Sequence, residues 1–146
     1  MPPTAPSLDA DVVARLRLAV LRLARRLRQQ AQTGITPSQL SALATLDRTG
    51  PLPLGELAAA EQIGASTLTR IVACLHDDGL VDRTVDPADR RVSRVGVTPK
   101  GRRLLKRARS RSDVALAERL AALDPDDAAA LLRAVPLLER LVGEET

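Results

Sequence analysis

The sequence predicts a mainly α-helical protein that carries one small β-hairpin within a single domain. Apolar residues recur at the three- and four-residue spacing of helices over most of the 146 residues. Proline just inside an apparent helix start, and glycine just past its end, delimit several of these segments. One stretch alternates instead, because Val81 to Val85 and Val92 to Val97 flank a turn-forming tip at Asp86–Arg91.

The first helix is expected to start near Leu8 and to end at Gly34, after a disordered tail over residues 1–7. Asp9 or Asp11 suits its first turn, where a carboxylate interacts favourably with the helix dipole. Its apolar stripe is wide, which is typical of a helix that contacts more than one neighbour. The members of this stripe are Val12, Leu16, Val20, Leu23 and Leu27.

Two further long helices are expected at the C-terminal end. Thr98 caps and Pro99 opens a helix over residues 99–122. The last helix spans residues 125–142, and Pro136 inside its pattern predicts a kink or a break because proline lacks the helical N–H. The apolar stripes of these terminal helices either pack together within one chain or pair across a two-fold axis with a second chain.

Three short helices are expected between the long ones. Thr36 and Pro37 begin the first. The second runs from Leu54 to Glu61 after a short extended piece, and the third begins after Gly64. Short helices at this spacing, joined by tight turns, are typical of a helix-turn-helix. The hairpin follows directly, as a wing would, so the fold class is a winged helix-turn-helix flanked by long helices.

The composition excludes several kinds of site. Phe, Tyr and Trp are absent, so no base can stack on an aromatic ring as in modules that bind single-stranded nucleic acid. One Cys and one His leave neither a disulfide nor a zinc cluster, and no metal or cofactor is expected. The cations are 20 Arg and two Lys, with a net charge of +4 and a pI near 10.5. Arg suits bidentate contacts with phosphates and base edges, although genomic base composition alone can raise its total.

The sequence also predicts a cytoplasmic protein that is not an enzyme. No apolar run approaches the ~20 residues of a membrane span, and the first ten residues lack the basic and apolar parts of a secretion signal. Gly-rich phosphate loops are absent, and the carboxylates lie mostly at helix starts. Nothing around Cys74 indicates an activated thiol, so oxidation sensing is kept as a minor alternative.

The third short helix has an apolar face and a polar face. Its core face consists of Leu68, Ile71, Val72 and Leu75. Its opposite side carries the candidate DNA-contacting residues Ser66, Thr67, Thr69 and Arg70. Hydroxyls and N-terminal amides can bind phosphates, and one guanidinium can bind guanine O6 and N7 together. An ordinary solvated face has similar residues, so this helix alone does not decide the function.

The hairpin tip favours DNA binding more strongly. Arg90, Arg91 and Arg94 lie within five residues of one another. A ribbon with arginines at its tip can enter a minor groove, whose negative potential attracts them. Asp89 can hold one of these arginines in an extended rotamer, and Asp86 shapes the turn. A polar tip with incidental charges is the alternative.

The run from Glu56 to Gly101 resembles the winged helix of the MarR family of bacterial transcription regulators. The matching pieces are GELAAAEQIGASTLTRIVACLHDDGLVDR and DPADRRVSRVGVTPKG. Gly64 and Pro53 depart from the family, in which a Ser and a Thr that cap helices often stand at these places. The flanking long helices also suit the family; they are expected at 8–31, 99–122 and 125–142.

The resemblance implies a homodimer that binds a pseudo-palindromic duplex DNA operator as a repressor or an activator. Residues 8–34 and 99–146 would form the helical dimerisation region, and residues 35–98 the winged DNA-binding region. The polar face of the third short helix would lie in the major groove. Arg91, positioned by Asp89 and with Arg90 beside it, would enter the minor groove.

The resemblance further implies a small-molecule effector, because relatives of this kind often release DNA when an amphipathic acid binds between the two regions. Candidate pocket walls are Leu23, Leu27, Leu40, Leu43 and Leu46. Plain core is the better explanation of each of them, and without aromatic residues the pocket would offer a phenolic ring no stacking surface.

The remaining alternative is a helical adaptor that binds another protein and has no specific DNA binding. Such an adaptor would use its basic surface only for solubility. Salt dependence separates the two hypotheses, because log K for a DNA-binding protein falls steeply with log salt concentration.

Overall fold

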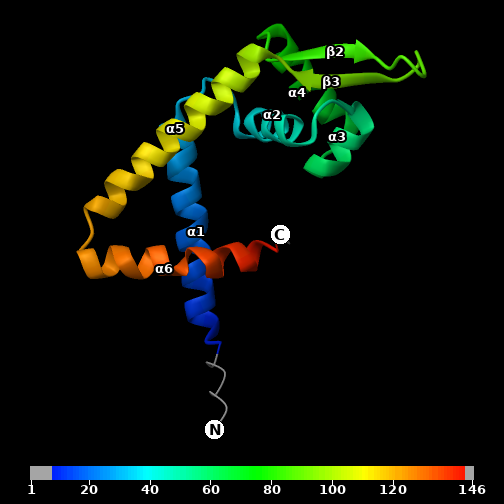
Figure 1. The fold of residues 1–146 in the computed structure, drawn as a ribbon. Coiled ribbons are helices and arrows are strands. Elements are labelled where there is room, and N and C mark those ends of the chain that lie inside the picture. Colours follow the sequence, from blue (N-terminus) through cyan, green and yellow to red (C-terminus); the bar gives the residue numbers. More distant parts are fainter. Residues whose placement is uncertain (1–7, 144–146) are drawn as a thin grey trace.

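The computed structural model describes residues 8–143, which form six helices and a three-stranded antiparallel sheet (Figure 1). The predicted fold class is confirmed. The expected tail at residues 1–7 lies outside the described residues, as do residues 144–146. The elements in chain order are α1 (Ala10–Ala31), α2 (Pro37–Thr49), β1 (Leu52–Pro53), α3 (Leu54–Glu61), α4 (Ala65–Asp77), β2 (Val81–Val85), β3 (Ser93–Val97), α5 (Pro99–Ala121) and α6 (Pro125–Val142).

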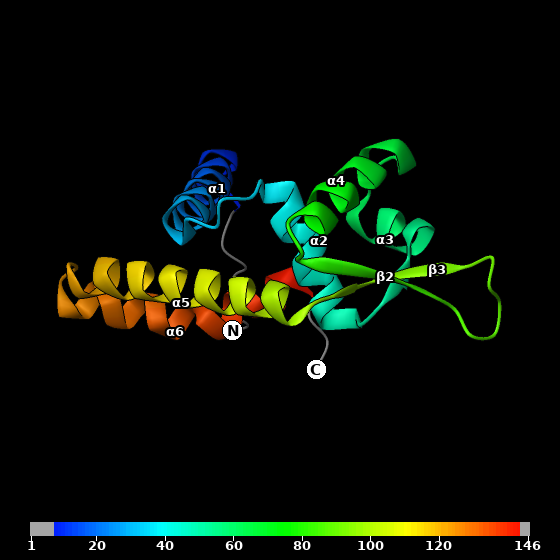
Figure 2. The same ribbon diagram turned by 90° about the horizontal axis from the view of Figure 1, so that it is seen from above.

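The molecule has two parts that are built differently. The winged part comprises α2, α3, α4 and the sheet, which pack together around the N-terminal end of α5 (Figure 1). The helical part comprises α1, the rest of α5, and α6. The C-terminal end of α1 contacts the middle of α5, where Ser112 Oγ donates to the Leu27 carbonyl at 3.2 Å. α6 turns back from the far end of α5 and diverges from it (Figure 1), and it lies away from α1 when the molecule is seen from above (Figure 2).

The winged part encloses an aliphatic core. Its largest fully buried side chains are Leu43, Leu46, Leu57, Leu68, Leu75, Leu80, Val72, Val81 and Val95. Burying one Leu or Val side chain contributes about 1.5–3 kcal/mol before the entropy of ordering is counted. α5 joins this core at Gly101, where a Cβ atom would lie 2.3 Å from the Leu80 carbonyl oxygen. Only glycine fits there, so α5 packs directly against the junction of α4 and β2.

The sheet has the order β1-β3-β2, with β3 in the centre. β2 and β3 form the predicted hairpin, in a register that runs from Val81↔Val97 to Val85↔Ser93. The second strand begins at Ser93, one residue later than expected. β1 is the short extended piece before α3, and its pairing with β3 was not predicted.

Most helix starts follow the caps that the sequence predicts. Thr36 Oγ1 accepts from Gln39 N at 3.2 Å and Gln39 Oε1 accepts from Thr36 N at 3.0 Å, which together form a capping box. Thr98 caps α5 and Asp124 caps α6. Neither Gly64 nor Pro53 provides a side-chain cap to the helix it precedes, as expected.

The residue that terminates α1 differs from the prediction. The last helical residue is Ala31, in agreement with the expected range 8–31, but the left-handed residue that follows it is Gln32, with a φ of 47°, and not Gly34. Arg111 Nη1 donates to the carbonyls of Ala31 and Gln32, at 3.1 Å each. These bonds from α5 satisfy two carbonyls that have no partner within the helix, and so they stabilise the earlier end.

Of the kink or break expected at Pro136, the break is wrong. α6 continues without interruption from Pro125 to Val142. Proline leaves the carbonyl of Leu132 without its helical donor, but Leu132 is 59% exposed, so water can solvate that carbonyl.

α1 and α6 leave apolar faces uncovered. α6 has no buried residue, although its sequence is strongly amphipathic. The arrangement in which the terminal helices bury one another within one chain is therefore contradicted. The large exposed apolar residues of these two helices are Val12, Val13, Leu16, Leu18, Val20, Leu21 and Leu23 of α1, and Leu131, Leu132, Val135, Leu137, Leu138, Leu141 and Val142 of α6.

Among the helices of residues 8–143, none has both the length and the apolar character that a membrane crossing requires.

Candidate nucleic-acid interface

α4 presents the polar face that its sequence predicts. Leu68, Val72 and Leu75 are buried in the core, and Ile71 is partly buried. The four candidate contact residues, Ser66, Thr67, Thr69 and Arg70, are all exposed. Arg70 takes part in none of the ion pairs within residues 8–143. Its guanidinium is therefore available to a partner outside the chain.

α4 is held in place at both of its ends. Before it, Glu61 at the end of α3 accepts from Ser41 Oγ at 2.7 Å and from Thr45 Oγ1 at 2.5 Å, which fixes α3 on α2. After it, Lys100 Nζ donates to the Asp78 carbonyl at 2.7 Å. Sequence reasoning missed Glu61 and Lys100, because their partners lie about 20 positions away along the chain and only the fold brings them together.

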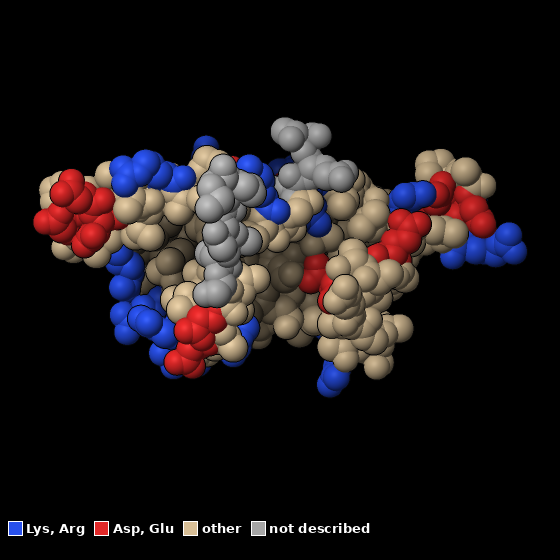
Figure 3. Space-filling view, turned by 90° about the horizontal axis from the view of Figure 1, so that it is seen from below, with Lys and Arg blue, Asp and Glu red and all other residues tan. Residues whose placement is uncertain are grey.

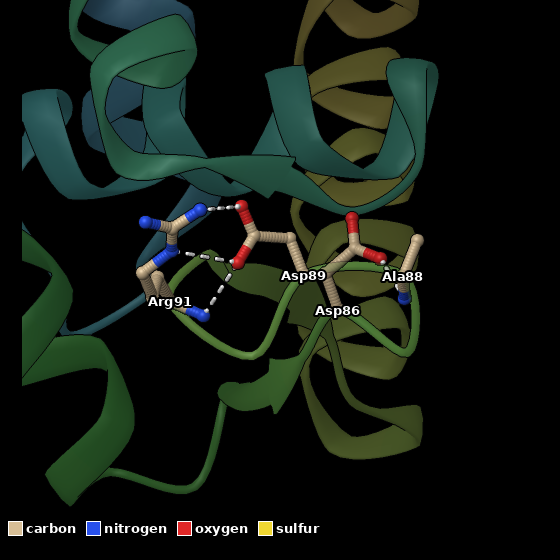
Figure 4. A network of polar contacts seen from close by, with 4 residues as sticks. All are labelled: Asp86, Ala88, Asp89 and Arg91. Atoms are coloured by element: carbon tan, nitrogen blue, oxygen red, sulfur yellow. Dashed lines mark hydrogen bonds and ion pairs between the residues drawn. The ribbon is translucent and has the colours of Figure 1, made fainter.

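The wing tip holds one arginine through an aspartate. Asp89 Oδ1 accepts from Arg91 N at 3.1 Å and from Arg91 Nε at 3.2 Å, and Oδ2 accepts from Nη2 at 3.5 Å (Figure 4). The predicted pairing of Asp89 with an arginine of the tip is confirmed. The Arg91 side chain remains 91% exposed, so its far side is open to a partner while its near side is held.

The other two arginines of the wing differ from each other. Arg90 is exposed, and it enters no ion pair within the described residues. Arg94 lies in β3, and its Nε and Nη2 donate to Asp86 Oδ2 at 3.2 and 3.0 Å. Sequence reasoning grouped Arg94 with the tip and missed this pair, because it depends on the register of the hairpin.

Both carboxylates of the tip are ionised at neutral pH. The backbone amide of Ala88, and then the Arg94 guanidinium, lower the pKa of Asp86 below its ordinary value of 3.8. The backbone amide of Arg91, and then its guanidinium, lower the pKa of Asp89 in the same way. Because the folded-state pKa values are lowered, the stabilisation from these contacts is present above pH 3.8 and is lost on acidification below it.

Comparison with known proteins identifies the family. A model described as the MarR family matches residues 35–93. A protein of Mycobacterium leprae, named as an uncharacterized HTH-type transcriptional regulator, is 41% identical over 137 residues, covering 93% of this chain and 96% of that protein. The chain belongs to the MarR family. It is therefore a helix-turn-helix transcriptional regulator, and its relatives are regulators of transcription rather than enzymes.

Solved structures of similar proteins agree with this MarR-family fold. A Pseudomonas aeruginosa protein assigned as a transcriptional regulator has a TM-score of 0.83 at 37% identity, covering 95% of this chain and 99% of that one. A mutant of MepR from S. aureus, bound to an oligodeoxyribonucleotide, has a TM-score of 0.70 at 22% identity, covering 92% of this chain and 98% of that one. The second likeness concerns the fold alone.

Charge is distributed unevenly over this MarR-family chain. Seen from below, Lys and Arg form the outermost end of the wing, with Asp and Glu directly beside them (Figure 3). Asp and Glu also cover the opposite end of the molecule, where α5 joins α6, and further Lys and Arg lie next to that end (Figure 3). Asp124, Asp126 and Asp127 lie at that acidic turn. A negatively charged partner is attracted to the outermost tip of the wing and repelled from the turn.

The five candidate pocket residues do not share one open wall. Leu43 and Leu46 are fully buried in the winged core, and Leu40 packs partly against it. Leu27 is half-buried on α1, and Leu23 is exposed there. A hollow of about 480 Å³ lies instead where the end of α1 meets the start of α2; its lining includes Arg25, Arg28, Gln29, Gln32 and Ile35.

Cys74 is exposed on α4, beside the polar face. A shallow hollow between α2 and α4 places it near Gln39 and Asp77. In residues 8–143 no cluster of His, Cys, Asp and Glu could hold a metal ion.

Proposed function

We propose that this MarR-family regulator binds a pseudo-palindromic duplex DNA operator as a homodimer. One observation carries the proposal: an uncovered polar helix face and an arginine-tipped wing belong to the same packed unit. On α4, no acidic side chain follows Glu61 until Asp77, so the N-terminal half of the helix can approach phosphates without repulsion.

Each candidate residue has a separate role in this proposal. The hydroxyls of Ser66 and Thr67 bind phosphates or base edges, together with the free amides at the start of α4. The Thr69 hydroxyl donates to the Ala65 carbonyl at 2.8 Å, so its oxygen accepts from a donor on a base edge. Arg70 binds a guanine in the major groove through two parallel hydrogen bonds. Arg91, held by Asp89, enters the adjacent minor groove, and Arg90 contacts the phosphates beside it.

The uncovered apolar faces of α1 and α6 support the homodimer. Monomeric proteins rarely expose apolar patches of this extent, and a two-fold pair would cover them. In this proposal residues 8–34 and 99–146 form the dimerisation region, and residues 35–98 form the DNA-binding region. The pair would carry twice the chain's net charge of +4, which favours association with DNA.

The proposal includes release of DNA by a small-molecule effector bound between α1 and the winged part. Leu23, Leu27 and Leu40 lie on the elements that meet there. Binding against Leu43 or Leu46 would require the core to open, because neither is accessible. Titration of small amphipathic carboxylic acids into the protein–DNA complex, followed by fluorescence anisotropy, tests this step.

Selection of bound duplexes from a random pool is the experiment that tests the proposal. The expected winner is a two-fold symmetric site whose half-sites lie about one helical turn apart, as two α4 helices on one face of DNA require. Salt titration of the winner should give a steep linear fall of log K with log salt concentration.

Two other results would count against the proposal. Selection of an asymmetric site that contains only one half-site would contradict binding as a homodimer. Enrichment of no sequence, with duplex affinity that does not respond to salt, would favour the helical adaptor instead.

A further inference from the structure

The wing changes from three strands to two at Arg94. β1 supports β3 through only two pairs, Leu52↔Val95 and Pro53↔Arg94. Beyond Arg94 one pair remains, Val85↔Ser93, and then the tip over residues 86–92 begins. A two-stranded hairpin alone is marginally stable in water. The tip that carries Arg91 therefore needs a further support.

The Asp86 carboxylate connects the sheet to the tip. Its Oδ2 accepts both bonds from Arg94, at 3.2 and 3.0 Å, while its Oδ1 accepts from Ala88 N at 2.8 Å. Arg94 stands directly opposite Thr84, so the ion pair crosses the hairpin on the diagonal. Asp86 is the more enclosed partner, since its side chain is 17% exposed against 41% for Arg94.

The two carboxylates of the tip serve different neighbours. Figure 4 shows Asp86 turned toward Ala88 and Asp89 turned toward Arg91. Asp89 thus holds the amide and the side chain of Arg91 itself, whereas Asp86 connects the backbone of the loop, at Ala88, to Arg94 in the sheet. The backbone bond from Asp86 N to the Val92 carbonyl, at 2.8 Å, closes the base of the same loop.

We propose that Asp86 and Arg94 are positioning residues, which hold the wing tip so that Arg91 meets DNA already in its bound orientation. This inference rests on the proposed function. Arg94 then acts within the protein and not on DNA, unlike the expectation from sequence. A tip that is ordered beforehand loses less conformational freedom on binding, so the ion pair increases operator affinity without a contact of its own.

The direction in which Asp86→Asn changes operator affinity tests the proposal. Asp86→Asn removes a negative charge from the DNA-facing wing, so electrostatics alone would tighten binding to the selected operator. Positioning predicts the opposite, a loss of affinity of about fivefold, because the single amide oxygen of Asn cannot accept from Arg94 and from Ala88 N at the same time. Asp82→Asn is the matched control, since Asp82 is an exposed carboxylate on β2 that enters no ion pair within residues 8–143. The control should bind equally well or more tightly.

A double-mutant cycle of Asp86→Asn with Arg91→Ala separates positioning of Arg91 from a direct contact between the ion pair and DNA. In an Arg91→Ala background, Asp86→Asn should cost almost nothing, because the side chain that it positions has been removed. An unchanged fivefold loss in that background would mean that the pair acts on DNA by another route, and it would overturn the proposal. Tighter binding by Asp86→Asn alone would overturn it as well.

A readout without DNA keeps the test independent of the proposed function. Backbone ¹⁵N order parameters of residues 88–91 in the free protein should fall in Asp86→Asn and stay unchanged in Asp82→Asn. Equal order parameters in both variants would refute the support of the tip. If the unmodified protein selects no duplex at all, the proposed function fails, and a fall in order parameters would then leave a supported loop without a role in DNA binding.

Discussion

Similar apolar residues are buried in the winged part and exposed in the helical part. Leu46 of α2 is 1% exposed, whereas Leu132 of α6 is 59% exposed, although both belong to amphipathic helices. The winged part encloses its leucines within one chain. The helical part projects them outward, on α6, which touches little of the same molecule, and on the face of α1 that α5 does not cover.

This difference separates two sources of stability. The winged part derives its stability from its own core, so its free energy of unfolding should depend weakly on protein concentration. The exposed apolar faces of α1 and α6 are not packed against the rest of the chain, and most of the stability of a helix comes from packing its apolar face. Their order should depend on a partner, and therefore on concentration.

The largest expected effect is on the core of the winged part. Leu46→Ala should lower the free energy of unfolding by about 3 kcal/mol, from lost burial and the cavity that remains. Leu132→Ala at the same protein concentration should change the unfolding of the winged part little. Urea titration monitored by circular dichroism measures both, and equal losses would remove the contrast between the two parts.

The next effect concerns association. Leu132→Asp should raise the dimer dissociation constant by at least about 30-fold, because a charge would be buried between the chains. Val85→Asp is the control, since Val85 on the wing is 57% exposed, nearly as much as Leu132, yet lies outside α1 and α6. Sedimentation equilibrium gives both constants. A fully dimeric Leu132→Asp variant would place the interface elsewhere.

A smaller effect is expected at the wing tip. Arg91→Ala should cost about 1–3 kcal/mol of operator affinity and reduce the salt dependence of binding. Arg133→Ala removes an exposed arginine from α6, and it should leave operator affinity unchanged. Fluorescence anisotropy at two salt concentrations compares them. Equal affinity of the Arg91→Ala dimer and the unmodified protein would exclude the wing from DNA recognition.

The smallest effect is on a helix end. Gln62 follows α3 with a left-handed φ of 55°, a conformation that glycine adopts at lower cost. Gln62→Gly should therefore raise the free energy of unfolding by about 0.5–1 kcal/mol. Ala60→Gly, inside α3, should lower it by about 1 kcal/mol. Thermal denaturation measures the melting temperatures of both variants. A shift of the two temperatures in the same direction would contradict this account.

Local signals predicted most of the fold. Thr36 with Pro37, Thr98 with Pro99, and Asp124 with Pro125 each combine a cap with a proline, and each marks an observed helix start. The polar face of α4 also followed from helical spacing alone. Such features depend on neighbours within one turn, so the sequence contains the whole of the information.

The features that were missed depend on distant partners. Arg111 of α5 binds the carbonyls of Ala31 and Gln32 at the end of α1, a contact that the sequence around Gly34 did not indicate. β1 is a strand only because β3 lies beside it, and Arg94 faces Asp86 only in the observed register. Pro136 stays helical because α6 is exposed, which its amphipathic pattern did not suggest. The role of each residue at DNA remains a prediction.

The close contact at Gly101 gives α5 the properties of a lever. The helix runs from that contact, at the base of the winged part, to the turn that leads into α6, and 21 of its residues lie from Gly101 to Ala121. At 1.5 Å per residue this arm is about 30 Å long, so a rotation of about 5° at the contact displaces its far end by about 3 Å. With the far ends joined in the proposed dimer, the same rotation would change the separation of the two α4 helices by a comparable amount. In the proposed regulator, a substitution that forces the contact at Gly101 apart would therefore alter the spacing of the operator half-sites.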